Sequence, residues 1–289
     1  MTDSNRLAAS VRERLLNLAR ARGEDFQQIL VRFALERLLY RLAQFPHRER
    51  FVLKGALLFR LWLDLDQRPT RDIDLLGFGD SDPERCAALF REILAAGGDL
   101  AYDGLEFDLE SVRAEPIRKE AGYPGVRVSM SARLARARIP VQCDIGFGDA
   151  VTPAPTQKTY PTLLDMPAPT LKVYPLETVA AEKLEAMIKL AGFNSRLKDY
   201  FDLWVLIRFE HIDLAVLPAA IRATFSRRQT AVPTTLPVGF SPQFAADKQL
   251  MWKAFLMRSG LTAPPLAEVI EVLCERYWPL LQAAAGHEP

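Results

Sequence analysis

Two aspartates stand one residue apart in a short apolar segment, where Asp72 and Asp74 flank Ile73. Successive side chains of a β-strand point to opposite faces, so both carboxylates are expected on one face and Ile73 and Leu75 on the other. Two residues of strand span roughly 6–7 Å, which lets both carboxylates reach one divalent cation. Without a cation, two like charges on one face repel each other. The pattern predicts a metal site, and a solvated surface strand is the plainer alternative.

A lysine and a glycine, Lys54 and Gly55, precede this strand at the start of a predicted helix over residues 56–63. Glycine lets a backbone come close to a ligand, and the free N–H groups at a helix start suit a phosphate. The segment matches neither the P-loop nor the Rossmann glycine pattern. The pair is therefore a candidate phosphate site only in company with the aspartates.

The hydrophobic period changes to two between residues 105 and 147, which predicts β-strands. In the last of them, residues 139–147, the apolar residues occupy the odd positions and leave Asp144 on the other face. There Asp144 could complete a site with Asp72 and Asp74, or it could simply face solvent.

The same region is the most basic part of the chain. Its basic residues are Arg113, Arg118, Lys119, Arg127, Arg133, Arg136 and Arg138. Such a group could neutralise the backbone phosphates of a nucleic acid. Ordinary outward-facing strand residues are the alternative.

A predicted helix after Pro175 carries Lys183 in the middle of its apolar stripe. A lysine facing a core requires a carboxylate or a bound anion, unless its long stem reaches solvent. The next predicted helix, residues 196–207, is apolar almost all round but carries Asp199 and Asp202 on one face. These aspartates are the available partners of Lys183, either in an anion site or in a structural ion pair.

The whole pattern predicts an α+β fold, in which a mixed sheet with helices is followed by an α-helical C-terminal half. Other helical stretches cover residues 6–46, 84–96, 245–258 and 265–284. Asp25 is expected to cap the second helix of the first stretch. Residues 226–243 are expected to form a loop.

Six prolines between residues 151 and 175 predict an extended connector. The domain boundary is placed here, between a first domain of residues 1–160 with its N-terminal helices and a helical second domain of residues 161–289.

Composition excludes several classes of protein. A length of 289 residues allows one large domain or two medium ones, and a net charge of +1 gives no overall argument for a nucleic-acid partner. Cys86, Cys143 and Cys274 form no disulfide or zinc pattern, and Cys143 is expected in the core. No apolar run approaches the 18 residues of a membrane span and no signal core begins the chain, so a cytoplasmic protein is expected.

The ordered motifs of this chain resemble the AbiEii/AbiGii toxin family of nucleotidyltransferases, which are toxins of type IV toxin–antitoxin systems. The matching segments are residues 51–56, 68–75, 144–149, 174–184 and 198–202. The ordered set is more specific than an Asp-x-Asp pair alone. It covers most of the chain, from the N-terminal helices to about residue 210.

The resemblance implies a polymerase-β-like nucleotidyltransferase core with a helical C-terminal region. It implies a toxin of a toxin–antitoxin or abortive-infection system, usually encoded beside an AbiEi-type antitoxin. Some members transfer nucleotides to the 3′ end of tRNA. The implied reaction moves NMP from a nucleoside triphosphate to an RNA acceptor, with Mg²⁺ or Mn²⁺ as cofactor.

By the same resemblance, Asp72 and Asp74 would bind the metal that bridges the triphosphate and activates the acceptor hydroxyl. Asp144 would be a third acid, either as the base or as a further metal ligand. Gly55 would let the triphosphate approach, and Lys54 would assist.

The downstream motifs would then complete the nucleotide site. Lys183 would neutralise phosphate charge, with Asp199 orienting the lysine. Asp202 and Arg71 would contribute to nucleotide binding. The fold commonly has Gly-Ser at the helix start, whereas this chain has Ala56 after the glycine and lacks that hydroxyl contact.

Other functions fit parts of the pattern. A glycosyltransferase could use the Asp-x-Asp metal site, but Lys183 and Asp199 would have no natural role. A phosphatase with an aspartate nucleophile is disfavoured by Leu76 at the position where Thr or Val is usual. A catalytically weak binding protein on the same scaffold, and transfer to a protein or small molecule, both stay open.

Overall fold

The computed structural model describes residues 3–63, 70–118, 124–208 and 212–286. They form two compact units. Unit 1 consists of Met1–Gly148 and Thr156–Val173, and unit 2 consists of Asp149–Pro155 and Tyr174–Pro289.

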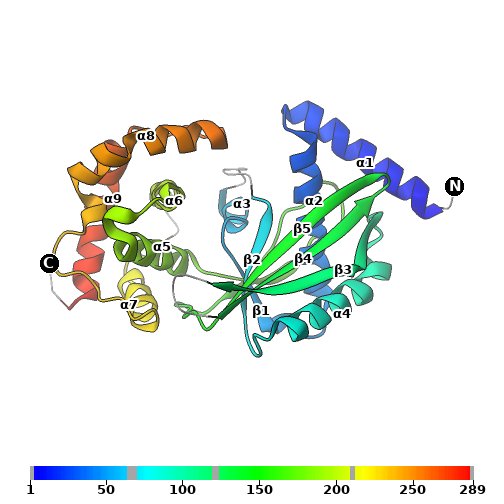
Figure 1. Cartoon of the computed structure of the whole chain (residues 1–289), viewed down its shortest axis with the longest axis horizontal. Coiled ribbons are helices and arrows are strands. Elements are labelled where there is room, and N and C mark those ends of the chain that lie inside the picture. Colours follow the sequence, from blue (N-terminus) through cyan, green and yellow to red (C-terminus); the bar gives the residue numbers. More distant parts are fainter. Residues whose placement is uncertain (1–2, 64–69, 119–123, 209–211, 287–289) are drawn as a thin grey trace. The chain divides into compact units, whose positions relative to one another are not determined.

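Unit 1 is built around a mixed sheet (Figure 1). Its elements are α1 (Asp3–Arg22), α2 (Phe26–Gln44), η1 (Arg48–Arg50), β1 (Phe51–Lys54), α3 (Leu58–Leu63), β2 (Asp72–Gly77), α4 (Pro83–Ala101), β3 (Leu105–Arg118), β4 (Pro124–Leu134), β5 (Ala137–Phe147), β6 (Thr156–Thr159) and β7 (Thr170–Val173). In the described residues the strand order is β3-β4-β5-β2-β1-β7-β6. β2 pairs parallel with β5 and β1 parallel with β7, and the other neighbours are antiparallel.

The two faces of this sheet differ in polarity because β4 and β5 alternate. Val128 and Cys143 on one face are fully buried, as expected for Cys143, while Arg127 and Asp144 on the other are partly exposed. α2 and α4 pack on the apolar face, and α4 runs alongside β3 and β4 (Figure 1). The predicted capping of α2 by Asp25, which accepts from the Gln28 amide, is confirmed.

A buried ion-pair network anchors α2. Arg37 and Arg41, at 0% and 2% exposure, both donate to Asp103 Oδ2 at 2.9 Å. Although burial opposes ionisation, hydrogen bonds from these arginines hold the pKa of Asp103 below its usual value. The neighbouring Glu36 accepts from the Leu163 amide at 2.7 Å, but burial outweighs this bond and raises the pKa of Glu36 to about 7.

The proline-rich segment is more ordered than a connector. Residues 156–159 and 170–173 form β6 and β7, and the six prolines all lie outside these two strands. Proline cannot donate to a sheet ladder, so only the proline-free stretches pair. Leu53 of β1 pairs with Val173 of β7, which joins the segment to unit 1. The two compact units divide after residues 148, 155 and 173, whereas the boundary was expected between residues 160 and 161.

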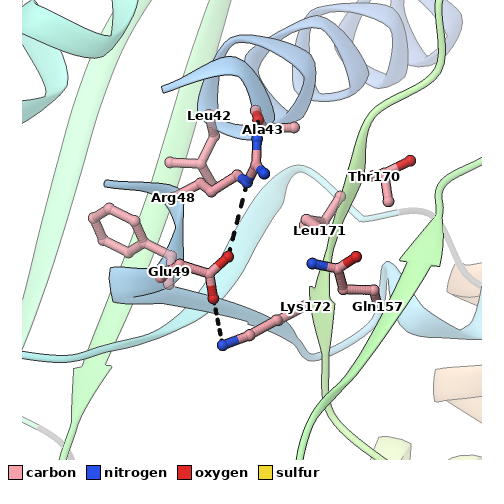
Figure 2. A pocket seen from close by; sticks show the side chains of 9 residues that line it. Leu42, Ala43, Arg48, Glu49, Gln157, Thr170, Leu171 and Lys172 are labelled. Carbon is pink, nitrogen blue, oxygen red and sulfur yellow. Dashed lines mark hydrogen bonds and ion pairs between the residues drawn. The ribbon is translucent and has the colours of Figure 1, made fainter. Parts of the chain in front are cut away.

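Ion pairs also tie the turn before β1 to β7. Figure 2 shows Glu49 between Arg48 and Lys172, with Arg48 Nε at 3.8 Å from Glu49 Oε1 and a direct contact from Lys172 Nζ. The cavity beside them has a volume of about 10 Å³. It has room for about one water molecule, so it is a packing feature and not a substrate site.

Unit 2 is helical, as the sequence predicts for the C-terminal half. Its elements are α5 (Leu176–Leu190), η2 (Ala191–Phe193), α6 (Leu197–Ile207), α7 (Leu217–Arg227), η3 (Val238–Phe240), α8 (Pro242–Ser259) and α9 (Leu266–Ala284). α7 was not predicted. The expected loop over residues 226–243 contains the last two residues of α7, the whole of η3 and the first two residues of α8. None of the described helices combines the length and apolar character needed to cross a membrane.

Replacing Glu36 with glutamine is expected to stabilise the protein above pH 7. The folded protein keeps this carboxyl protonated up to about pH 7, whereas the unfolded chain ionises it near 4.5. The folded state binds more protons between these values, so the wild-type protein loses stability as the pH rises through them. The shift corresponds to at most about 3 kcal/mol.

Thermal unfolding at about pH 5 and about pH 8 measures this effect, with the exposed Glu13→Gln as the control. The Glu36→Gln gain in Tm should be clearly larger at the higher pH. Equal changes at both values would contradict the raised pKa.

Candidate active site

The aspartates of β2 lie near the middle of the sheet of unit 1, between β1 and β5. Ile73 and Leu75 are each 1% exposed, whereas Asp72 and Asp74 are only partly buried. The predicted alternation is therefore confirmed, and both carboxylates lie on the polar face.

Four charged residues form a row across four neighbouring strands. Lys54 of β1 is paired in register with Asp74. Asp74 is paired with Asp144 of β5, which in turn is paired with Arg127 of β4. Paired residues point to the same face, and neighbouring strands lie about 4.8 Å apart. The row thus holds two adjacent carboxylates with a cation at each end, and the predicted placement of Asp144 beside the β2 aspartates is confirmed.

Asp144 is held by a bidentate ion pair. Arg127 donates from Nε to Oδ1 and from Nη2 to Oδ2, both at 2.9 Å. The hydrogen bond to Asp144 raises the pKa of the Arg127 guanidinium. Gln142 Nε2 also donates to Oδ1 of Asp144, at 3.3 Å. Each oxygen of Asp144 therefore accepts at least one hydrogen bond, so a metal ion or a proton at this carboxylate competes with Arg127.

The other two carboxylates have different surroundings. Asp72 Oδ1 accepts from the Thr70 hydroxyl at 2.8 Å. Asp74 lies under Gly55, where the backbone has a φ of +76°. A Cβ at Gly55 would lie 2.7 Å from Asp74 Cβ and Cγ, so a side chain there would collide with the carboxylate. The glycine therefore makes room for the Asp74 carboxylate itself, which lies against the bare backbone. A turn precedes α3, which begins at Leu58 and not at residue 56.

The donor set suits a hard cation, because Mg²⁺ takes oxygen ligands from one or two carboxylates and completes its shell with water or phosphate. In the described part of the chain, however, no three carboxylate, histidine or cysteine side chains converge as a ready ligand group. Asp72 and Asp74 lie on one face of β2 and are the first candidates to hold a metal together. A metal at Asp144 would compete with Arg127 for that carboxylate.

Arg71 is exposed and directly precedes β2. Its neighbours Arg68 and Pro69 in the same motif lie outside the described residues. Lys54 is 9% exposed, at the β1 end of the row.

A second group of predicted site residues lies in unit 2. Lys183 Nζ of α5 donates to Asp199 Oδ1 at 3.1 Å and to Asp202 Oδ2 at 2.6 Å, both on α6. Asp199 is 2% exposed and also lies 2.9 Å from Arg196 Nε. Burial opposes its ionisation, but Lys183 and Arg196 hold the pKa of Asp199 below its usual value. The predicted pairing of Lys183 with both aspartates is confirmed.

Sequence reasoning missed another charged cluster in unit 2. Arg228 lies within 3.1 Å of carboxylate oxygens of Asp149, Glu182 and Glu185. Glu182 and Glu185 are three residues apart on α5, and Asp149 ends the segment at residues 144–149. The i, i+3 spacing could have indicated the two glutamates, but nothing local indicated Arg228.

The basic strand region is less positive than its composition indicates. Arg127 is neutralised by Asp144, and Arg133 Nη2 lies 2.6 Å from Glu106 Oε2. Arg113 and Arg138 instead bond to neutral oxygens, of the backbone and of Ser131. Lys119 and the side chain of Arg118 lie outside the description.

The chain belongs to the family described as nucleotidyl transferase AbiEii toxin, type IV TA system, which matches residues 37–283. The protein is thus a member of a nucleotidyltransferase toxin family, and type IV systems pair such a toxin with an antitoxin. The α+β fold and the family expected from the motifs are confirmed.

Other comparisons add little. A search of curated proteins found no match. A candidate nucleotidyltransferase from H. pylori is 16% identical, with a TM-score of 0.46 over 91% of this chain and 96% of that one. JHP933 from Helicobacter pylori is also 16% identical, with a TM-score of 0.47 over 91% and 93% of the two chains.

Gly55→Ala is expected to destabilise the protein more than Gly23→Ala. Both glycines have left-handed backbone, with φ of +76° and +66°, so either alanine introduces strain of roughly 1–2 kcal/mol. Only at Gly55 does the new Cβ also collide with Asp74, since nothing lies within 4 Å at Gly23. Urea unfolding of both variants measures the difference. Equal losses would show that Asp74 gives way freely.

Proposed function

We propose that this chain is a metal-dependent nucleotidyltransferase that transfers NMP from a nucleoside triphosphate to an RNA acceptor, first of all the 3′ end of tRNA. The observation that carries the proposal is the parallel register of β2 and β5, which aligns Asp74 with Asp144 and leaves Asp72 two residues away on the same face. Membership of the family supports the reaction class. An AbiEi-type antitoxin is the partner that we propose for the toxin.

The residues of β2 and of the turn before α3 are proposed to bind the metal and the triphosphate. When bound, Mg²⁺ or Mn²⁺ would supply positive charge that stabilises the negative charge of the reacting phosphates. Asp72 and Asp74 would hold the metal, and Gly55 lets the Asp74 carboxylate lie close against the backbone at the start of this turn. Lys54 balances charge at the β1 end of the row.

Asp144 is proposed to act as the base or as an additional residue that would hold the metal. In the transfer, the acceptor oxygen forms a bond to the α-phosphorus, the bond to the β-phosphate oxygen breaks and pyrophosphate leaves. The proton of the acceptor hydroxyl would go to Asp144, in competition with Arg127, or Asp144 would help to hold the metal. A carboxylate next to the site can do either, and the Arg127 contact competes with both roles.

Lys183 is proposed to contact phosphate charge, with Arg71 and Asp202 also at the nucleotide. Lys183 is 15% exposed, and two buried carboxylates fix its direction. A lysine held in this way is already ordered, so it loses little further freedom on binding a phosphate. A purely structural ion pair would have the same geometry.

The acceptor is proposed to lie along the polar face of β3, β4 and β5. Arg113 is opposite Ser129, which is opposite Gln142 and then Asp72, so Arg113 is three strands from the metal ligands. That separation is about 14 Å. Arg113 and Arg138 keep their charge for phosphates, whereas Arg127 and Arg133 are already paired.

One observation favours the competing function, a catalytically weak binding protein on this scaffold. Arg127 occupies both oxygens of Asp144, and the described carboxylates form no ready three-ligand site. Metal-independent binding of nucleotides, or none, would support that alternative. Protein and small-molecule acceptors are the other outcomes of the tests below.

An incorporation assay tests the reaction. Wild type and Asp74→Asn are incubated with Mg²⁺, total tRNA and each labelled NTP in turn. We expect label in tRNA from one nucleotide, and at least about a hundredfold loss in the variant, because one metal ligand is neutral. Absence of label with all four nucleotides would refute the tRNA assignment, and the same samples would then be tested with protein acceptors.

Arg127→Met is expected to bind Mn²⁺ about tenfold more tightly than wild type, because the bidentate pair that competes with the metal is gone. Titration by calorimetry measures the affinity, and Arg133→Met is the control because its partner Glu106 is far along the strand. The gain should vanish in Arg127→Met/Asp144→Asn. Weaker Mn²⁺ binding in Arg127→Met would show that Arg127 supports the metal site instead of competing with it.

A further inference from the structure

The apolar face of the sheet of unit 1 contains a cavity of about 360 Å³. It lies between the first half of α4 and the neighbouring parts of β1 and β5. Phe51 stands three residues before Lys54, and Phe147 three residues after Asp144, so both rings lie on the face opposite the charged row. The cavity is therefore separate from the candidate active site.

Aromatic side chains make up a third of the residues that line the cavity. Four phenylalanines line it, namely Phe51, Phe78, Phe90 and Phe147. The rings of Phe51 and Phe90 meet edge to face with centroids 6.1 Å apart. Phe78 is 49% exposed at the mouth, which is unusual for so large an apolar side chain.

A glycine of β2, Gly77, makes room for two of the side chains that line the cavity, Ile145 and Phe147. A Cβ at Gly77 would lie 2.7 Å from Ile145 Cγ2 and 2.8 Å from Phe147 Cε1. Both side chains therefore lie over the bare backbone of β2, which forms a smooth apolar surface. The cavity is a consequence of the local sequence and is not a gap between loosely packed elements.

One cation at the mouth has no acid to balance it. Arg50 Nε lies 3.5 Å from the Phe78 carbonyl, and Arg50 Nη2 packs close to the backbone of Gly79. No carboxylate of the described residues forms an ion pair with Arg50. Arg85, in contrast, is matched by Asp80 at 2.5 Å. Glu92 on α4 also lines the cavity and repels an anion at its own end, so a negative group is directed to Arg50.

We propose that this cavity binds a small aromatic anion, with its ring system among the phenylalanines and its negative group on the Arg50 guanidinium. The volume falls in the range of about 300–1000 Å³ that is typical of small-molecule sites. Ring-to-ring contacts favour a flat aromatic body, and an under-paired guanidinium favours a carboxylate, sulfonate or phosphate. The site is independent of the nucleotidyltransferase reaction.

Fluorescence titration with 1-anilinonaphthalene-8-sulfonate tests the site on the full-length protein. The neutral N-phenyl-1-naphthylamine has the same rings without the sulfonate. We expect one saturable site for the sulfonate and about tenfold weaker binding in Arg50→Met, because a charge-assisted hydrogen bond is lost. The neutral compound should bind wild type and Arg50→Met alike.

Two variants locate the binding. Ala88→Trp places a large ring into the cavity from the exposed side of α4 and should abolish binding of both compounds, with an unchanged circular dichroism spectrum. Arg48→Met is the matched control, since Arg48 is on the same turn but donates to the Ala43 carbonyl. Binding that survives Ala88→Trp, or that falls equally in Arg48→Met and Arg50→Met, would overturn the proposal.

Discussion

Asp74 and Asp144 lie side by side on parallel strands, and two carboxylates at that spacing repel each other unless cations answer them. In this protein Lys54 and Arg127 stand at the two ends of the row. Parallel pairing of β2 with β5 requires a long crossover, which α4, β3 and β4 provide. The helix and the hairpin thus bring Asp144 back to Asp74, and the hairpin also supplies Arg127. The geometry of the candidate site depends on this one strand pairing.

The same strands form the core on their other face. Ile73, Leu75 and Cys143 are buried on the apolar face, while the carboxylates between them stay on the polar side. A slip of one residue in register would turn every carboxylate into the core and every apolar side chain outward. Apolar burial therefore fixes the register, and the register in turn positions the charged row. A site on rigid central strands is held more precisely than one on loops.

In unit 2, charged residues of α5 form ion pairs with two neighbouring segments. Lys183 faces two acids of α6, and the adjacent Glu182 together with Glu185 faces Arg228. An apolar helix such as α6 could rotate without losing much burial, whereas a charged group left unpaired in the interior is destabilising by several kcal/mol. The ion pairs between Lys183 and the two aspartates therefore fix how α6 is rotated relative to α5. That orientation is a condition for any role of Lys183 at a phosphate.

Local features of this protein follow from sequence alone, because backbone geometry determines them. The common face of Asp72 and Asp74, the polar side for Asp144, and the cap at Asp25 need only strand alternation or helix ends. The need of Lys183 for acids follows from burial, and the ordered motifs indicate the family. Tertiary structure alone decided which strands pair. Arg127 meets Asp144, and β6 and β7 join the sheet from a proline-rich segment, because strand register connects residues that no local pattern relates.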